Sequence, residues 1–306
     1  MDNLNETFEN IRIEKYKRYK KYIFLMFSFL GLTVIGFFIT LFTIIFGNRQ
    51  NIFLIILPFV SFTLPIVPTI VFGAMAIVTN YKFSKNVKSQ ALPEMLKTVY
   101  KNSCYELNGG IPLKDILMTK MVYAPSNHKS EDYIKGIYNN IFFESCDLTL
   151  KTTSTDGQGH TTETVYFNGL WIILKKIRNE NNSVLVLERG FPSGSMKGLE
   201  KAEVEGILFN KKFKIYATSK FDAFYVLKPV LLEKLVALEE EHKGTIAFGY
   251  VGKDLHIGIN DFKNHFEFSI KKPLTSENVA LFRTNIDIFK DLIDIFKLRN
   301  ANDESI

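Results

Sequence analysis

Two long apolar runs near the N-terminus constrain this chain more than any other feature of its sequence. They cover residues 22–46 and 52–79, contain no charged residue, and are separated by residues 47–51. A bilayer core about 30 Å thick needs roughly 20 apolar helical residues, so each run is long enough to cross it. Backbone amides must be satisfied internally in lipid, which predicts two spanning helices. The short connection predicts an antiparallel helical hairpin.

A buried core helix and a secretory signal are the other structures that an apolar run can form. A signal has an apolar stretch of about 7–15 residues that ends at a small-residue cleavage site, and the first run is longer and has no such site before Gly47. The second run contains Pro58, Pro65 and Pro68. Proline removes a backbone donor, which predicts a kink near Pro65, with a re-entrant segment as the alternative.

Basic residues flank the hairpin on both sides, whereas the connection has only Arg49. Positive residues stay in the cytoplasm, so both termini are expected inside and the connection outside the plasma membrane. Such flanks also attract anionic lipid by about 1 kcal/mol per residue near the surface, although setting the topology is the simpler role. The candidate lipid-headgroup contacts are Lys15, Lys17, Arg18, Lys20, Lys21, Lys82, Lys85 and Lys88.

The overall charge is modest outside these flanks. The whole chain carries a net charge of +6 at pH 7, whereas residues 81–306 have 31 Lys and Arg against 28 Asp and Glu, which is 31 − 28 = +3. This soluble part has no long basic stripe with interleaved aromatic residues, which argues against nucleic-acid binding. Cys104 and Cys146 are the two cysteines, too few for a disulfide framework and as expected in a reducing compartment.

The remainder of the chain mixes strand and helix patterns. Apolar residues that repeat every three or four positions predict helices over 82–107, 229–242 and 276–298, with a short helix over 112–121. The last of these is expected to dock on a sheet, with the juxtamembrane helix or a second subunit as alternatives. Strand signals cover 133–136, 141–153, 162–177, 183–188, 213–218, 223–227, 245–251 and 255–259.

This order of elements predicts an α+β fold. Short strands followed by helices, without regular βαβ alternation, favour a mostly antiparallel sheet with flanking helices after the transmembrane hairpin. The expected segments are a basic cytoplasmic lead-in (1–21), the two-span hairpin (22–79), a juxtamembrane helical segment (80–125) and a soluble α+β domain (126–306).

Catalytic motifs are missing from the sequence. The glycine-rich segment from Arg189 to Gly198 fits neither GxxxxGK[ST] nor GxSxG, and is expected to be a flexible surface loop. The five histidines lack metal-ligand spacing, so no metal or cofactor is expected. Cys146 lies mid-strand, where a free cysteine is usually a core residue, and a Cys–His nucleophile assembled in space is the alternative.

Four short patterns point to a known family. They are Glu131-Asp132-Tyr133-Ile134-x-Gly136, Phe167-Asn168-Gly169-Leu170, Val204-Glu205-x-x-Leu208-Phe209-x-x-x-Phe213 and Ala223-Phe224-Tyr225-Val226-Leu227-Lys228-Pro229. With the hairpin, they resemble an uncharacterised bacterial family of two-span membrane proteins that have a domain of unknown function. The patterns are typical of fold landmarks, with glycines at close backbone approaches and a proline at a helix start. The resemblance implies no activity and no site residue.

These observations predict a membrane-tethered cytosolic module that binds or scaffolds a protein partner or anionic lipid. Association with a second copy of the chain is a further option. The alternative function is a membrane-tethered enzyme whose site is assembled from scattered polar residues, with Cys146 and the histidines as candidates. Transport is disfavoured because two spans without an intramembrane charge offer no pathway.

Overall fold

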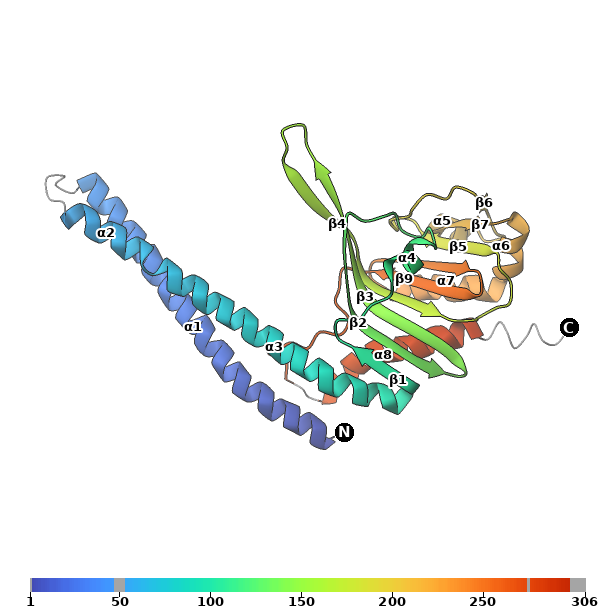
Figure 1. The fold of residues 1–306 in the computed structure, drawn as a ribbon, viewed down its shortest axis with the longest axis horizontal. Helices are drawn as coiled ribbons and strands as arrows, with labels where there is room; N and C mark the ends of the chain where they lie inside the picture. Colours follow the sequence, from blue (N-terminus) through green and yellow to red (C-terminus); the bar gives the residue numbers. More distant parts are fainter. Residues whose placement is uncertain (1, 47–52, 274–275, 298–306) are drawn as a thin grey trace. The chain divides into compact units, whose positions relative to one another are not determined.

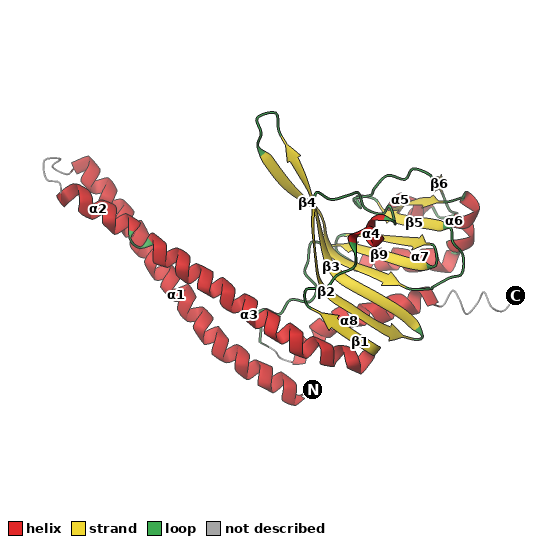
Figure 2. Ribbon diagram, viewed as in Figure 1, coloured by secondary structure: helices red, strands yellow, loops and turns green. Residues whose placement is uncertain are grey.

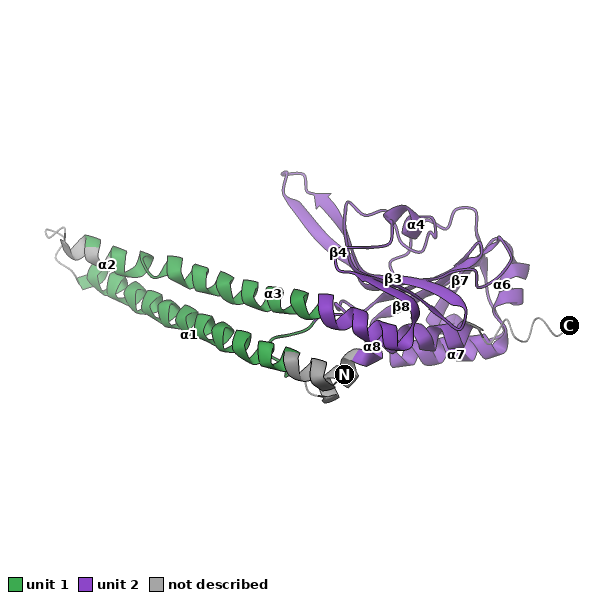
Figure 3. Cartoon of the chain, turned by 60° about the horizontal axis from the view of Figure 1, so that its bottom comes forward, with its two compact units in different colours: residues 1–88, 268–279 green, residues 89–267, 280–306 purple. Residues whose placement is uncertain are grey.

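The computed structural model describes residues 2–46, 53–273 and 276–297. The chain forms two compact units, residues 1–88 with 268–279 and residues 89–267 with 280–306 (Figure 3). The first unit is mainly helical, whereas the second contains a large sheet with helices (Figure 2).

The first unit is a helical hairpin. Its helices are α1 (Asp2–Phe46), α2 (Phe53–Thr63) and the first part of α3 (Ile66–Val99). The second arm is interrupted at the predicted proline, because α2 ends at Thr63 and α3 starts at Ile66, and both helices lie beside α1 (Figure 1). Two helical stretches of the described residues are long and apolar enough to cross a membrane, Phe8–Phe46 within α1 and Phe59–Val99, which runs across the break between α2 and α3. The predicted external connection, residues 47–51, lies outside the described residues.

Small and aromatic residues bring the two arms of the hairpin together. The ring of Phe72 on α3 stacks against Tyr22 and Phe29 of α1, with centroids 6.4 and 5.7 Å apart. Closer to the connection, Gly36 of α1 faces the backbone of Ser61 on α2, and a Cβ atom at Gly36 would lie 2.5 Å from the Ser61 carbonyl oxygen. Only glycine fits this approach without a shift of one helix.

A segment from late in the chain completes the first unit. Residues 268–272, which we call the strap, are held by side chains of both arms. The backbone amides of Phe268 and Ile270 donate to Ser84 Oγ (3.4 Å) and Asn80 Oδ1 (3.1 Å) on α3. From α1, Arg12 Nη1 donates to the Ile270 carbonyl oxygen at 3.0 Å. The strap therefore links α1 to α3.

The second unit is an antiparallel sheet with flanking helices, which confirms the predicted α+β fold. In the described residues, nine strands lie in the order β1-β2-β3-β4-β9-β8-β5-β7-β6. The strands are β1 (Lys101–Glu106), β2 (Asn127–Tyr138), β3 (Ile141–Thr155), β4 (Thr161–Leu174), β5 (Ser183–Glu188), β6 (Glu200–Ala202), β7 (Phe213–Ala217), β8 (Thr245–Val251) and β9 (Asp254–Asn260). The helices are α4 (Leu113–Leu117), α5 (Ile207–Lys212), α6 (Lys220–Val226), α7 (Pro229–Glu241) and α8 (Ser276–Lys297).

Helix α8 covers one face of the sheet, as its periodicity predicts. Its buried side chains include Phe289, which stacks on Phe143 of β3 with centroids 4.8 Å apart. Near the C-terminal end of α8, the ring of Phe296 packs against Phe248 of β8, with centroids 5.7 Å apart. The opposite face carries Trp171 and is covered by α4 and by the loops around residues 111–122 and 191–199.

Two sequence predictions are wrong in detail. The helix expected over 82–107 ends at Val99, and β1 follows it and pairs with β2. The strand expected over 223–227 is helix α6, because Ser219 and Asp222 form a capping box at its N-terminus. A short apolar run cannot by itself distinguish a strand from a helix, and here the cap decides.

Strands β3 and β4 continue past their neighbours as a two-stranded ribbon (Figure 1). The last pair between β2 and β3 is Asn127 with Lys151, and the pairing of β4 with β9 starts at Gly169 with Asn260. The polar residues 156–160 form the tip of the ribbon between Thr155 and Thr161. A Cβ atom at Gly169 would lie 2.1 Å from the Ile259 carbonyl oxygen, which confirms the expected close approach at this glycine.

Candidate functional site

The predicted lipid-contacting residues all lie in the first unit, and we call them the basic collar. The collar comprises Lys15, Lys17, Arg18, Lys20 and Lys21 on α1 and Lys82, Lys85 and Lys88 on α3. Its two halves occupy the same end of the hairpin, because Tyr22 and Lys82 line one shallow groove between the arms. Six collar side chains are exposed, Lys15 is half-buried, and Lys88 is buried with 3% of its surface exposed.

Tyrosine rings lie among these cations. The ammonium of Lys20 lies 4.7 Å from the centre of the Tyr16 ring, and Tyr16 stacks on Tyr19 at 6.2 Å. Lys271 of the strap lies 5.7 Å from the centre of the Tyr19 ring. Amphipathic tyrosine side chains next to cations are typical of the headgroup level of a membrane. Sequence reasoning missed Lys271, because nothing in the local sequence indicates that the strap returns to α1.

Not every charge near the collar is available to a ligand. Arg12 pairs with Glu9 at 2.6 Å and is almost fully buried, so it fixes the strap. Arg18 pairs with Glu14 at 2.8 Å, but both side chains are 60% exposed. Such an exposed pair is worth at most about 1 kcal/mol, so Arg18 can exchange this partner for an anionic headgroup.

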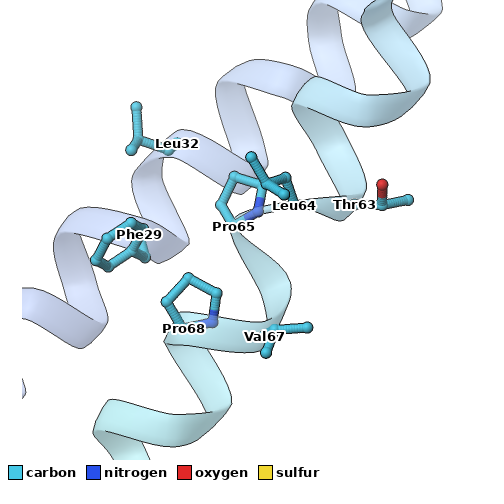
Figure 4. Close-up of a pocket in the computed structure, with 7 residues that line it drawn as sticks. All are labelled: Phe29, Leu32, Thr63, Leu64, Pro65, Val67 and Pro68. Carbon is cyan, nitrogen blue, oxygen red and sulfur yellow. The ribbon is translucent and has the colours of Figure 1, made fainter. Parts of the chain in front are cut away.

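Apolar side chains cover the outside of the hairpin beyond the collar. Only 6% of the residues in the most apolar window of each long helix are buried. An open groove lies between α1 and the break that separates α2 from α3 (Figure 4). Its lining residues are Phe29, Leu32, Thr63, Leu64, Pro65, Val67 and Pro68.

Cys146 and the histidines do not form a nucleophilic site in the described part of the chain. Cys146 is fully buried in β3 opposite Trp171, and burial raises the pKa of its thiol to about 11. A thiol that is neutral and inaccessible near pH 7 cannot act as a nucleophile. The histidines are dispersed, with His128 and His160 exposed and His265 paired with Asp261 at 3.2 Å. Among the residues described, no group of three potential ligands could hold a metal ion.

The glycine-rich segment is an ordered cover on the sheet. Phe191 is buried in the core, the Gly194 amide donates to the Lys120 carbonyl oxygen at 3.2 Å, and Lys120 Nζ donates to the Lys197 carbonyl oxygen at 2.6 Å. The segment therefore packs against the 111–122 loop and has no phosphate-loop geometry.

His256 is a buried titratable residue of the second unit. It is buried on β9, and burial together with the nearby Lys175 lowers its pKa to about 4. Lys175 in turn bridges Glu144 (2.7 Å) and Asp254 (3.3 Å). The ring of Trp171, the sole tryptophan, lies 6.4 Å from the imidazole.

Acid is therefore expected to destabilise the second unit through His256. The folded-state pKa lies below the unfolded value of about 6.5, so the unfolded chain binds the proton first and stability falls as the pH drops from 6.5 to 4. The full shift corresponds to about 3 kcal/mol. Urea unfolding of the full chain, followed by Trp171 fluorescence at pH 7 and pH 4.5, measures this loss.

The matched variants separate this residue from general acid effects. His256→Leu should remove most of that pH-dependent loss, and His128→Leu, at an exposed position of β2, should leave it unchanged. Equal pH dependence in wild type and His256→Leu would assign the loss to the carboxylates.

Comparisons with known proteins cover part of the chain. Residues 165–298 match a family model described as "Protein of unknown function (DUF3137)". No curated protein matches. The crystal structure of the mycobacterial trehalose monomycolate transport factor A, TtfA, aligns with 10% identity and a TM-score of 0.40, covering 66% of this chain and 92% of that one. That likeness carries no conclusion about function. From β4 to α8, the chain is thus similar to a family of unknown molecular function.

Proposed function

We propose that this protein is a two-span membrane protein that tethers a binding or scaffolding module to the inner face of the cytoplasmic membrane. The hairpin crosses the bilayer, both termini and the second unit are cytoplasmic, and the basic collar contacts anionic lipid headgroups. The second unit is the module that binds a protein partner.

The exposed apolar surface of the hairpin carries this proposal. Phe24 and Phe46 of α1 and Ile77 of α3 are each more than 70% exposed, and many further Phe, Ile, Leu and Val side chains of the hairpin are at least 38% exposed. Contiguous apolar patches above a few hundred Å² are rare on soluble monomers. A bilayer core provides the apolar environment that these side chains lack in water.

The collar supports the orientation and the lipid contact. Its cations lie at the end of the hairpin that holds the strap, where Lys21 and Lys82 are the first charges outside the apolar runs. The excess of positive charge at this end favours a cytoplasmic location. Tyr16 and Tyr19 add an aromatic component at the same level.

The enzyme alternative is less well supported than the binding role, because Cys146, its candidate nucleophile, is fully buried. We therefore propose a binding role.

A lipid-dependent stability measurement tests the collar. The full chain is reconstituted in nanodiscs of phosphatidylcholine, with or without phosphatidylglycerol, and its Tm is measured at low and high salt. Anionic lipid that binds the folded collar should raise Tm, and salt should reduce the increase. Replacing exposed collar residues with Gln should abolish most of it. The substituted residues are Lys17, Arg18, Lys21, Lys82 and Lys85.

The control variant carries five Gln substitutions at exposed lysines of the second unit. Its phosphatidylglycerol effect should match that of wild type. An equal effect in the collar variant would show that the collar only sets topology. The control positions are Lys201, Lys211, Lys243, Lys253 and Lys263.

A further inference from the structure

The solvent-facing side of α6 carries large apolar side chains where a surface helix normally carries polar ones. Phe221 is 76% exposed, Phe224 53% and Tyr225 43%, and Val230 at the start of α7 is 65% exposed. Phe221 and Tyr225 stack on each other with centroids 6.5 Å apart. We call these four residues the α6 patch. Clustered exposed aromatic residues mark an interaction surface.

The helix that presents the patch is held in one geometry. Ser219 and Asp222 form a capping box at its N-terminus, and the Asn182 side chain also donates to Asp222. Ala223 and Val226 are fully buried on the inner side. A surface that is already ordered has less entropy to lose on binding, which favours a partner of matching shape.

Positive charge borders the patch. Lys220, the first residue of α6, and Lys228, the N-cap of α7, are both exposed, and Lys228 Nζ lies 5.8 Å from the centre of the Tyr225 ring. The single carboxylate of α6, Asp222, is engaged in the cap. Aromatic anchors inside a charged rim are typical of protein interfaces, and this rim complements acidic side chains.

We propose that the α6 patch docks an amphipathic segment of a partner protein, in which apolar residues are flanked by carboxylates. This inference deepens the proposed binding role of the second unit by naming its site and the chemistry of its partner. A fluid bilayer would gain nothing from the fixed positions of these four side chains, whereas a folded or folding peptide segment would.

A random peptide library displayed on phage tests the proposal. The library is selected on the full chain in phosphatidylcholine nanodiscs and counter-selected on the Phe221→Ser/Phe224→Ser double variant. Enriched peptides should combine apolar residues at helical spacing with a net negative charge. Their affinity should fall at least tenfold in the double variant, fall in Lys220→Glu/Lys228→Glu, and stay unchanged in Phe262→Ser, an exposed phenylalanine outside the patch.

Three results would overturn the proposal. They are no enrichment against the double variant, enrichment of neutral or basic peptides, and equal affinity for the double variant and Phe262→Ser.

In a parallel measurement, the nanodiscs are mixed with phosphatidylglycerol vesicles. Vesicle binding that requires Phe221 and Phe224 would assign the patch to lipid instead. The peptide selection contains no anionic lipid. Its result therefore does not depend on whether the basic collar binds anionic lipid.

Discussion

Gly169→Ala is expected to destabilise the second unit by about 3 kcal/mol or more, because a strained, overpacked backbone contact must open. The added Cβ atom would lie 2.1 Å from the Ile259 carbonyl oxygen, a backbone atom that cannot rotate away. Gly169 is also the residue where β4 begins to pair with β9. Strands β4 and β9 would have to move apart at this position.

Urea unfolding of the full chain, followed by Trp171 fluorescence, measures this loss. Gly157→Ala is the matched control, because the same methyl group in the ribbon tip meets no atom within 4 Å. It should change the free energy of unfolding by less than about 0.5 kcal/mol, as surface substitutions usually do. Equal stability of the two variants would contradict the close approach of β4 and β9.

Gly36→Ile is expected to separate the arms of the hairpin, with a cost of about 3 kcal/mol, the upper range for overpacking. The new side chain would meet the carbonyl oxygen of Ser61 at 2.5 Å and the amide nitrogen of Phe62 at 2.9 Å. The helix break at Pro65 follows directly after this contact, so α1 and α2 approach each other next to the point where the second arm is interrupted. Small residues allow such close helix contacts in membranes.

Spin labels on α1 and α2 report the separation. With Cys104 replaced by serine, labels at the exposed positions Ile39 and Val60 should give a longer and broader distance distribution in Gly36→Ile than in wild type. Gly31→Ile is the control, since its Cβ position meets nothing within 4 Å. An unchanged distribution in Gly36→Ile would show that the arms do not touch there.

Elements with a long or regular pattern could be predicted from the sequence. Strand β5, the β8–β9 hairpin and α8 follow from local periodicity, and the structure gives them nearly the predicted bounds. The apolar runs are helical as expected, but α1 already begins at Asp2 and α3 continues to Val99. Helix α6 could not be predicted, because an exposed aromatic face reads as a strand pattern until Ser219 and Asp222 are recognised as a cap.

Features set by distant parts of the chain also could not be predicted. The spacing of the basic flanks suggests equal roles for Lys85 and Lys88, yet Lys85 is exposed and Lys88 is buried. The position of Lys271 beside Tyr19 depends on the return of the strap to α1. The lipid contact of the collar stays a prediction.

The strap also imposes an order on biogenesis. The ribosome synthesises α1, α2 and α3 long before residues 268–272, and the parts of a chain generally fold in the order of their synthesis. Until then, Arg12, Asn80 and Ser84 lack the backbone partners that they have in the finished protein. The first unit is thus completed only after β9 has been made, so a chain truncated before the strap would leave the hairpin without the contacts that link α1 to α3.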